Sequence, residues 1–236
     1  MSTITSGLAV PYEAVPFQRF HLRLGAAGCG GQFADGFELG IIGIAVSLAA
    51  GPLQLSAVQM GLLGAGALAG LFVGALVTGV IADRIGRRTI FAFDMLLAAV
   101  ISGAQFFATE AWHLMVLRVL LGFVLGADYV VSKSLVMELA PVNFRGRLLS
   151  FMAIAWAAGY TSAYAVGFLL RDLGPDSWRY MLAVSAIPAL VIFGLRVGIP
   201  ESPLWLIRRG RTKEAQAIVT RLFGSGVALP EVMSYG

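Results

Sequence analysis

The sequence is poor in charge, in cysteine and in histidine. Only 13% of its 236 residues are charged, against about 25% in an ordinary soluble domain. A single cysteine, Cys29, excludes a disulfide framework within the chain. With two histidines and no Cys/His spacing there is no candidate metal site, and no phosphate-binding glycine loop is present, so we expect no cofactor and no enzyme. The hydrophobic share of 58% instead indicates an integral membrane protein.

Six long apolar runs are each able to cross the hydrocarbon core of a bilayer, which takes about 20 residues. Charged residues, glycine and proline separate them, as at Gly51-Pro52 and Asp83-Arg84. We therefore expect an all-α integral membrane protein with a bundle over residues 25–198, preceded by a cytoplasmic segment 1–24. The expected spans are residues 25–50, 57–82, 89–108, 112–138, 148–170 and 178–198.

Basic residues gather in every second connection, which predicts the orientation of the bundle. With the N-terminus inside, 13 of the 17 lysines and arginines fall on the inner side, and only Arg171 and Arg179 fall in outer loops. This bias indicates a multi-pass protein of the cell membrane with both termini in the cytoplasm. It also explains the net charge of +4 without a nucleic-acid partner. The inner residues are Arg19, Arg23, Arg84, Arg87, Arg88, Arg145, Arg147, Arg196, Arg208, Arg209, Arg211, Lys213 and Arg221.

The segment 199–236 has a different character from the spans. Pro200 ends the last apolar run, Ser202 is a candidate helix N-cap, and Pro203 suits the first helical position. The following residues alternate apolar and basic groups at helical spacing. We expect an amphipathic helix along the cytoplasmic face, followed by the start of a central loop.

Ionisable residues lie inside the first and fourth expected spans, where charge is costly and usually functional. Asp35 and Glu38 are three residues apart in the first span, and Arg118, Asp128 and Lys133 lie in the fourth. One interpretation is that these charges pair only to permit insertion. The other is a polar cavity at mid-membrane that binds a polar substrate or a proton, since burial favours the neutral form of a carboxyl group.

Small residues recur every four positions in two spans, a spacing that lets helices pack closely. The simplest interpretation is packing inside the bundle. The stripes are Gly66, Gly70, Gly74 and Thr78 in the second span, and Ala155, Gly159, Ala163 and Gly167 in the fifth.

Residues 79–88 read G-V-I-A-D-R-I-G-R-R and resemble the cytoplasmic signature of the major facilitator superfamily, G-x-x-x-D-R-x-G-R-R. Three further stretches, 118–129, 138–147 and 200–206, resemble its sugar-porter and metabolite–proton symporter branch. The resemblance assigns conformational gating to Gly79, Asp83, Arg84, Gly86, Arg87, Arg88, Arg118, Glu138, Arg145, Gly146 and Glu201.

The resemblance implies two inverted three-helix repeats that form the N-terminal half of a twelve-span transporter. It also implies a second six-helix bundle as partner, either a copy of this chain or a separate C-terminal half, and a second interpretation in which the glycine stripes face that bundle. Substrate or proton contacts are expected from a carboxylate of the first span and from the fourth. The residues concerned are Asp35, Glu38, Asp128, Tyr129 and Lys133.

Two functions remain open at this point. The first is proton-coupled symport of a small polar or anionic metabolite; Val130 and Ile154 depart from the pattern of phosphate symporters and count against phosphate. The second is a half-length membrane protein that does not transport and serves as a sensor or an assembly subunit. The ionisable residues inside the spans favour transport, because a passive scaffold gains nothing from burying them.

Overall fold

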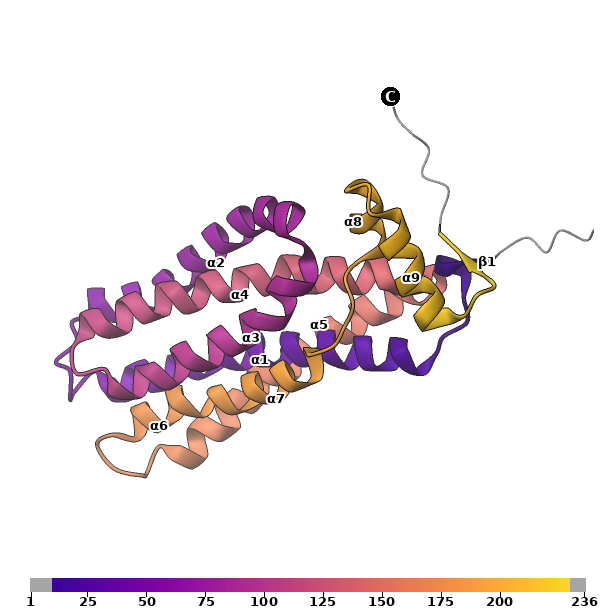
Figure 1. Ribbon diagram of the computed structural model, residues 1–236. Helices are drawn as coiled ribbons and strands as arrows, with labels where there is room; N and C mark the ends of the chain where they lie inside the picture. The colour runs from indigo at the N-terminus through magenta and orange to yellow at the C-terminus, as the bar shows by residue number, and fades with distance from the viewer. Residues whose placement is uncertain (1–9, 230–236) are drawn as a thin grey trace, which may run out of the picture.

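The computed structural model describes residues 10–229, and six helical segments in that part of the chain are long and apolar enough to cross a membrane. The predicted all-α bundle is therefore confirmed (Figure 1). The spans are α1 (Arg19–Ala49), α2 (Ala57–Ile85), α3 (Arg87–Ala104) with the 3-10 turn η2 (Gln105–Phe107), α4 (Ala111–Leu139), α5 (Val142–Leu170), and α6 (Ser177–Val184) with α7 (Ala186–Arg196).

Three spans depart from their expected form, and the first of them begins at Arg19 rather than at residue 25. The fifth begins at Val142 rather than at residue 148, because Pro141 starts the helix and the arginines that follow lie in its polar first turns. The sixth is interrupted at Ser185, between α6 and α7. Pro188 explains the break, since it has no amide hydrogen to offer the Val184 carbonyl four residues earlier.

The helices pair across the bundle, α2 along α4 and α1 along α5, while α3 lies against α4 and α7 (Figure 1). Glycine makes the α2–α4 contact possible. A Cβ atom on Gly70 would collide with the backbone of Val119, and one on Gly74 with the backbone of Phe123. The backbones of the two helices therefore touch, as small residues permit in membrane bundles.

The α1–α5 contact is built in the same way. A Cβ atom on Gly159 would meet the Phe33 carbonyl, and Gly167 lies against the side chain of Ile44. Both glycine stripes thus pack inside the bundle, and the alternative interpretation, that they face a second bundle, is wrong. The long apolar side chains Phe72 and Leu76 of α2 lie exposed instead, on the outside of the bundle.

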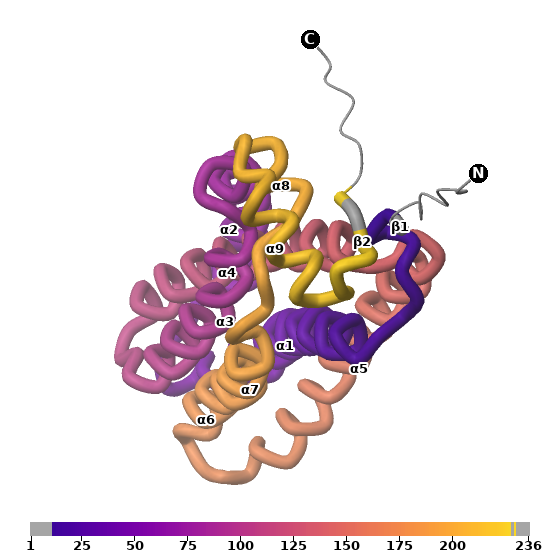
Figure 2. The backbone as a smooth tube through the Cα atoms, turned by 45° about the vertical axis from the view of Figure 1, so that its right-hand side comes forward, coloured from indigo at the N-terminus to yellow at the C-terminus, as the bar shows by residue number. Residues whose placement is uncertain are grey.

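The tail forms two short helices instead of one, α8 (Pro203–Arg208) and α9 (Thr212–Phe223), because Gly210 turns the chain with a φ of +73°. Ser202 caps α8 as expected, accepting a hydrogen bond from the Trp205 amide at 3.2 Å. After α9, strand β2 (Val227–Ala228) pairs in parallel with β1 (Val10–Pro11), near the 3-10 turn η1 (Tyr12–Ala14). Figure 2 shows α8, α9 and this strand pair together at one end of the bundle.

Candidate functional site

Four helices bring three carboxyl groups to one buried guanidinium. We call this group the aspartate cluster: Asp35 of α1, Asp94 of α3, Asp128 of α4 and Arg196 of α7, each at most 5% exposed. Arg196 Nη1 lies 2.8 Å from Asp94 Oδ1 and 2.6 Å from Asp128 Oδ1. The guanidinium thus forms close ion pairs with two of the three acids.

The surroundings of Arg196 hold it in place. Its guanidinium donates to the Phe91 carbonyl at 3.1 Å and lies over the Phe91 ring, 4.0 Å from the ring centre. Gly31 makes room for it, since a Cβ atom there would collide with Arg196 Nη2. Within the described residues, the cluster contains no second buried cation, so one guanidinium faces three acids.

A separate ion pair lies elsewhere in the bundle. Glu38 of α1 and Arg118 of α4 are both 1% exposed, with Arg118 Nη1 3.8 Å from Glu38 Oε2. Ser102 of α3 donates to the other Glu38 oxygen. Asp35 and Glu38 are three residues apart in sequence, yet they belong to two different groups of charges.

Arg196 and Asp94 are the residues of the cluster that the sequence analysis did not single out. The expectation for Arg196 is only a place on the inner side, near the end of the last apolar run. The Arg196 side chain is buried in the last turn of α7. Asp94 is the one charged residue between Thr89 and Ala108, and the rule that singled out Asp35 would have found it.

A cavity of about 520 Å³ opens between α1, α4 and α5 beside the aspartate cluster. Gln32, Tyr129, Lys133 and Trp156 supply its polar groups. The Lys133 ammonium lies 4.7 Å from the centre of the Tyr129 ring, and no carboxylate in the described part of the chain forms an ion pair with it. The structure thus brings Tyr129 and Lys133 together on one wall.

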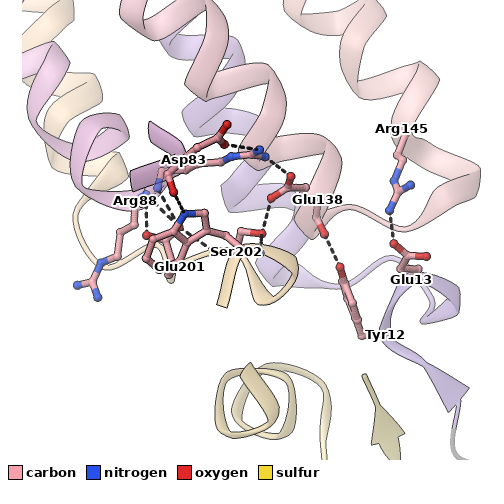
Figure 3. Close-up of polar contacts among 10 residues, drawn as sticks. Tyr12, Glu13, Asp83, Arg88, Glu138, Arg145, Glu201 and Ser202 are labelled. Atoms are coloured by element: carbon pink, nitrogen blue, oxygen red, sulfur yellow. Dashed lines mark hydrogen bonds and ion pairs between the residues drawn. The ribbon is translucent and has the colours of Figure 1, made fainter. Parts of the chain in front are cut away.

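A second polar group lies at the end of the bundle that carries α8 and α9 (Figure 3). Glu138, at the end of α4, accepts hydrogen bonds from Arg87 and from the Ser202 hydroxyl. Arg87 also lies 3.7 Å from the exposed carboxylate of Asp83. The ends of α2, α3 and α4 are thereby joined to the start of the tail.

Glu201 holds the start of α3. Its carboxylate accepts from the backbone amides of Arg87 at 3.1 Å and Arg88 at 3.2 Å, which are among the amides that an α-helix leaves free at its N-terminus. Gly86 has a φ of +100°, and a Cβ atom on it would collide with the Glu201 carboxylate. Trp205 Nε1 donates to the Asp83 carbonyl at 3.0 Å and completes the contact.

The N-terminal arm reaches the same end of the bundle. Tyr12 donates to the Glu138 carbonyl at 3.0 Å, and Arg145 donates to Glu13 at 3.0 Å (Figure 3). Burial, followed by the neighbouring charges of Glu13 and Glu138, raises the pKa of the Tyr12 phenol. The phenol therefore remains a hydrogen-bond donor at every physiological pH.

Not every residue of the expected gating set belongs to this network. Arg118 pairs with Glu38 inside the bundle, away from this network, and its assignment to gating stays a prediction. The Arg88 side chain points away from the network in Figure 3, and Arg84 takes part only through its carbonyl, which accepts from Arg209 at 2.7 Å. Gly146 is exposed, and a Cβ atom on Gly79 or Gly146 would meet open space.

Comparison with known proteins places the chain among transporters. Residues 24–234 match the family described as sugar (and other) transporter. The chain is 45% identical over 220 residues to the inner membrane metabolite transport protein YgcS of Escherichia coli, covering 93% of this chain and 49% of YgcS. It is 30% identical over 212 residues to the niacin transporter NiaP of Acinetobacter baylyi, covering 89% of this chain and 47% of NiaP.

The fold is similar to that of the proton:xylose symporter XylE of E. coli, with a TM-score of 0.79 at 26% identity. The match covers 87% of this chain and 50% of XylE. The chain thus spans about half the length of the relatives it matches.

Proposed function

Because the chain belongs to the sugar (and other) transporter family of the major facilitator superfamily, we propose that it is the N-terminal six-helix bundle of a secondary active transporter. Its substrate is a small polar or anionic metabolite that enters together with protons. The observation that carries this proposal is the Glu38–Arg118 pair, a titratable pair buried among membrane-spanning helices.

The loose geometry of this pair suits a proton exchange. The distance of 3.8 Å between Arg118 Nη1 and Glu38 Oε2 is longer than that of a hydrogen-bonded ion pair. By contrast, Arg196 Nη1 lies 2.6 Å from Asp128 and 2.8 Å from Asp94. Arg118 Nε and Nη2 have no other partner among the described residues. When Glu38 binds a proton, its attraction for Arg118 falls, and the helices α1 and α4 lose an electrostatic link. A proton bound from one side of the membrane and released to the other thereby biases the bundle between two states.

The cavity beside α5 supports the substrate class. Lys133 supplies a positive charge without an ion-pair partner in the described chain, while Tyr129 and Trp156 supply ring faces and polar hydrogens. Such a wall suits a small molecule with an anionic or hydroxyl-rich end. Niacin and xylose, named for the relatives NiaP and XylE, are two molecules of this kind.

The partner is a second six-helix bundle, and the network of Glu138, Arg87 and Glu201 controls the cytoplasmic opening between the two. The chain covers 49% of the length of the metabolite transport protein YgcS. The second bundle is either a copy of this chain or a C-terminal half. We place both termini in the cytoplasm, since the basic residues cluster at the end that carries α8 and α9.

Uptake into proteoliposomes tests the function. The chain is reconstituted alone and together with the C-terminal half of YgcS, and entry of labelled nicotinate and D-xylose is followed with and without an inward proton gradient. We expect one of the two preparations to accumulate a substrate only when the gradient is present. Accumulation that is the same with and without the gradient would exclude proton coupling, and binding without uptake in either preparation would favour the sensor alternative.

Cysteine labelling tests the orientation. In a Cys29→Ala background, we expect a membrane-impermeant maleimide to label Leu173→Cys, in the exposed turn between α5 and α6, in intact cells. Arg88→Cys, exposed at the opposite end of the bundle, should react only after the cells are opened. Labelling of Arg88→Cys in intact cells would reverse the proposed topology.

A further inference from the structure

A basic cavity of about 750 Å³ opens at the end of the bundle that carries α8 and α9. The start of α3 and the end of α7 line one side of it, and α8 and α9 line the other. Arg88, Arg211 and Arg221 supply its positive charge, while Phe93 and Phe193 supply apolar surface. The cavity thus lies where two membrane spans meet the tail, and it shares no residue with the cavity beside α5.

The charges that line this cavity do not cancel. Three arginines face two glutamates, and both glutamates already have partners. Glu201 accepts from backbone amides at the start of α3, and Glu214 forms an ion pair with Arg211 through two contacts of 2.7 Å. The side chains of Arg88 and Arg221 form no ion pair within the described part of the chain. Two guanidinium groups are therefore free to bind an anion.

An apolar cavity of about 480 Å³ adjoins the basic one, between α2, α3 and α4. The two cavities share Thr89 and Phe93, which lie one turn apart on α3 and form a ridge between them. The rest of the apolar cavity's lining is hydrophobic apart from Thr78 and Asp94, and Asp94 is held by Arg196. Phe93 is 57% exposed, which places the ridge on the outside of the bundle.

The length of the apolar cavity matches the depth of one leaflet. Its lining residues on α3 run from Thr89 to Val100. That distance along an α-helix is about 16 Å, and half of the hydrocarbon core of a bilayer is about 15 Å thick. The cavity begins beside the charged residues that precede the span and ends near mid-membrane. A lipid acyl chain has this length and this chemistry.

We propose that the two cavities together form a binding site for an anionic phospholipid from the leaflet at this end of the bundle, the cytoplasmic one in the topology given above. Its phosphate binds Arg88 and Arg221, and one acyl chain lies in the apolar cavity beyond the ridge of Thr89 and Phe93. Basic pockets beside membrane spans favour anionic headgroups, and each arginine near such a headgroup strengthens binding about fivefold. The bound lipid joins α3 and α7 to α8 and α9. The site is separate from the substrate path, and the inference holds whether or not the chain transports.

Photo-cross-linking of the unchanged chain in nanodiscs tests the site. The bilayer is phosphatidylcholine with a small share of a probe that carries a diazirine in its acyl chain, either phosphatidylglycerol or phosphatidylcholine. We expect the phosphatidylglycerol probe to label α3 between Phe93 and Val100 at least about tenfold more than the phosphatidylcholine probe does. Equal labelling by the two probes would overturn the proposal. So would labelling spread evenly over exposed apolar side chains elsewhere, such as Phe72 and Phe168.

Two double variants test whether the arginines hold the headgroup. Arg88→Gln with Arg221→Gln should reduce the labelling of α3 to the level of the phosphatidylcholine probe. Arg147→Gln with Lys213→Gln removes the same net charge from exposed positions at the same end, outside both cavities, and should leave the labelling unchanged. Unchanged labelling in the first variant, or an equal fall in both, would overturn the proposal, because the lipid would then be held elsewhere or only by the general surface charge.

Competition separates a lipid from a soluble phosphate ester, since both offer the anion that the arginines bind. Unlabelled phosphatidylglycerol should suppress the labelling of α3. Its soluble headgroup, glycerophosphoglycerol, should leave the labelling nearly unchanged even in molar excess, because it has no acyl chain to fill the apolar cavity. Suppression by the headgroup alone would assign the site to a soluble phosphate ester and would overturn the proposal of a lipid.

Discussion

Leucine in place of Gly74 is expected to abolish the folded bundle. A Cβ atom at this position would already collide with the backbone of Phe123 on α4, and a backbone cannot yield as a flexible side chain can. Overpacked side-chain cores lose roughly 1–3 kcal/mol, and separating two helices along a whole contact costs more. We expect the yield of monodisperse protein in detergent, measured by size-exclusion chromatography, to fall by about tenfold or more.

Gly64 supplies the matched control on the same helix. A Cβ atom there would meet nothing within 4 Å, so Gly64→Leu should give a yield close to that of the unchanged chain. The comparison also separates the two interpretations of the glycine stripe. If Gly74→Leu folded normally and lost only its association with a second bundle, the stripe would face that partner and the packing described here would be refuted.

Glutamine in place of Glu38 is expected to abolish proton-driven accumulation while leaving substrate exchange in place. The amide keeps the size of the side chain and can still accept from Ser102, but it cannot ionise and so cannot carry a proton or pair with Arg118 as an anion. With the membrane potential clamped, a one-proton symporter accumulates its substrate about tenfold for each pH unit of gradient, since that unit is worth about 1.4 kcal/mol. We expect Glu38→Gln to reach about equal concentrations on both sides.

The control for this variant is Glu110→Gln, at the exposed start of α4, which should accumulate substrate like the unchanged protein. Counterflow of labelled against unlabelled substrate shows that the Glu38 variant still binds and moves its substrate. If Glu38→Gln accumulated substrate as the unchanged protein does, proton coupling would have to be assigned to the aspartate cluster or to residues outside α1.

Much of the fold could be predicted because hydrophobic run length is a direct consequence of the bilayer thickness. All six spans and the Ser202 cap follow from local sequence. The partners of the glycine stripes do not, since spacing shows that a face packs closely but not what packs against it. The sequence pattern of α2 is the same whether Gly70 meets α4 of its own bundle or a helix of another.

The candidate site was predictable only in part, for a related reason. The burial of Asp35, Glu38 and Asp128 follows from their depth in apolar runs, but their division into two groups depends on side chains from α3 and α7 that are far away in sequence. Arg196 shows the limit: at the end of a span, an arginine that reaches into the bundle and one that reaches into water give the same sequence pattern. The direction of α7 and the acids around its last turn determine that the Arg196 side chain reaches into the bundle.

Substrate-induced proton movement is the most direct test of proton-coupled transport. A pH-sensitive dye is enclosed in proteoliposomes that hold the chain with the C-terminal half of YgcS, at equal pH on both sides, and unlabelled nicotinate or D-xylose is added outside. If the chain is half of a proton symporter, the interior acidifies as the substrate enters, and the change is absent with Glu38→Gln. Entry of labelled substrate with no change in internal pH would contradict the account.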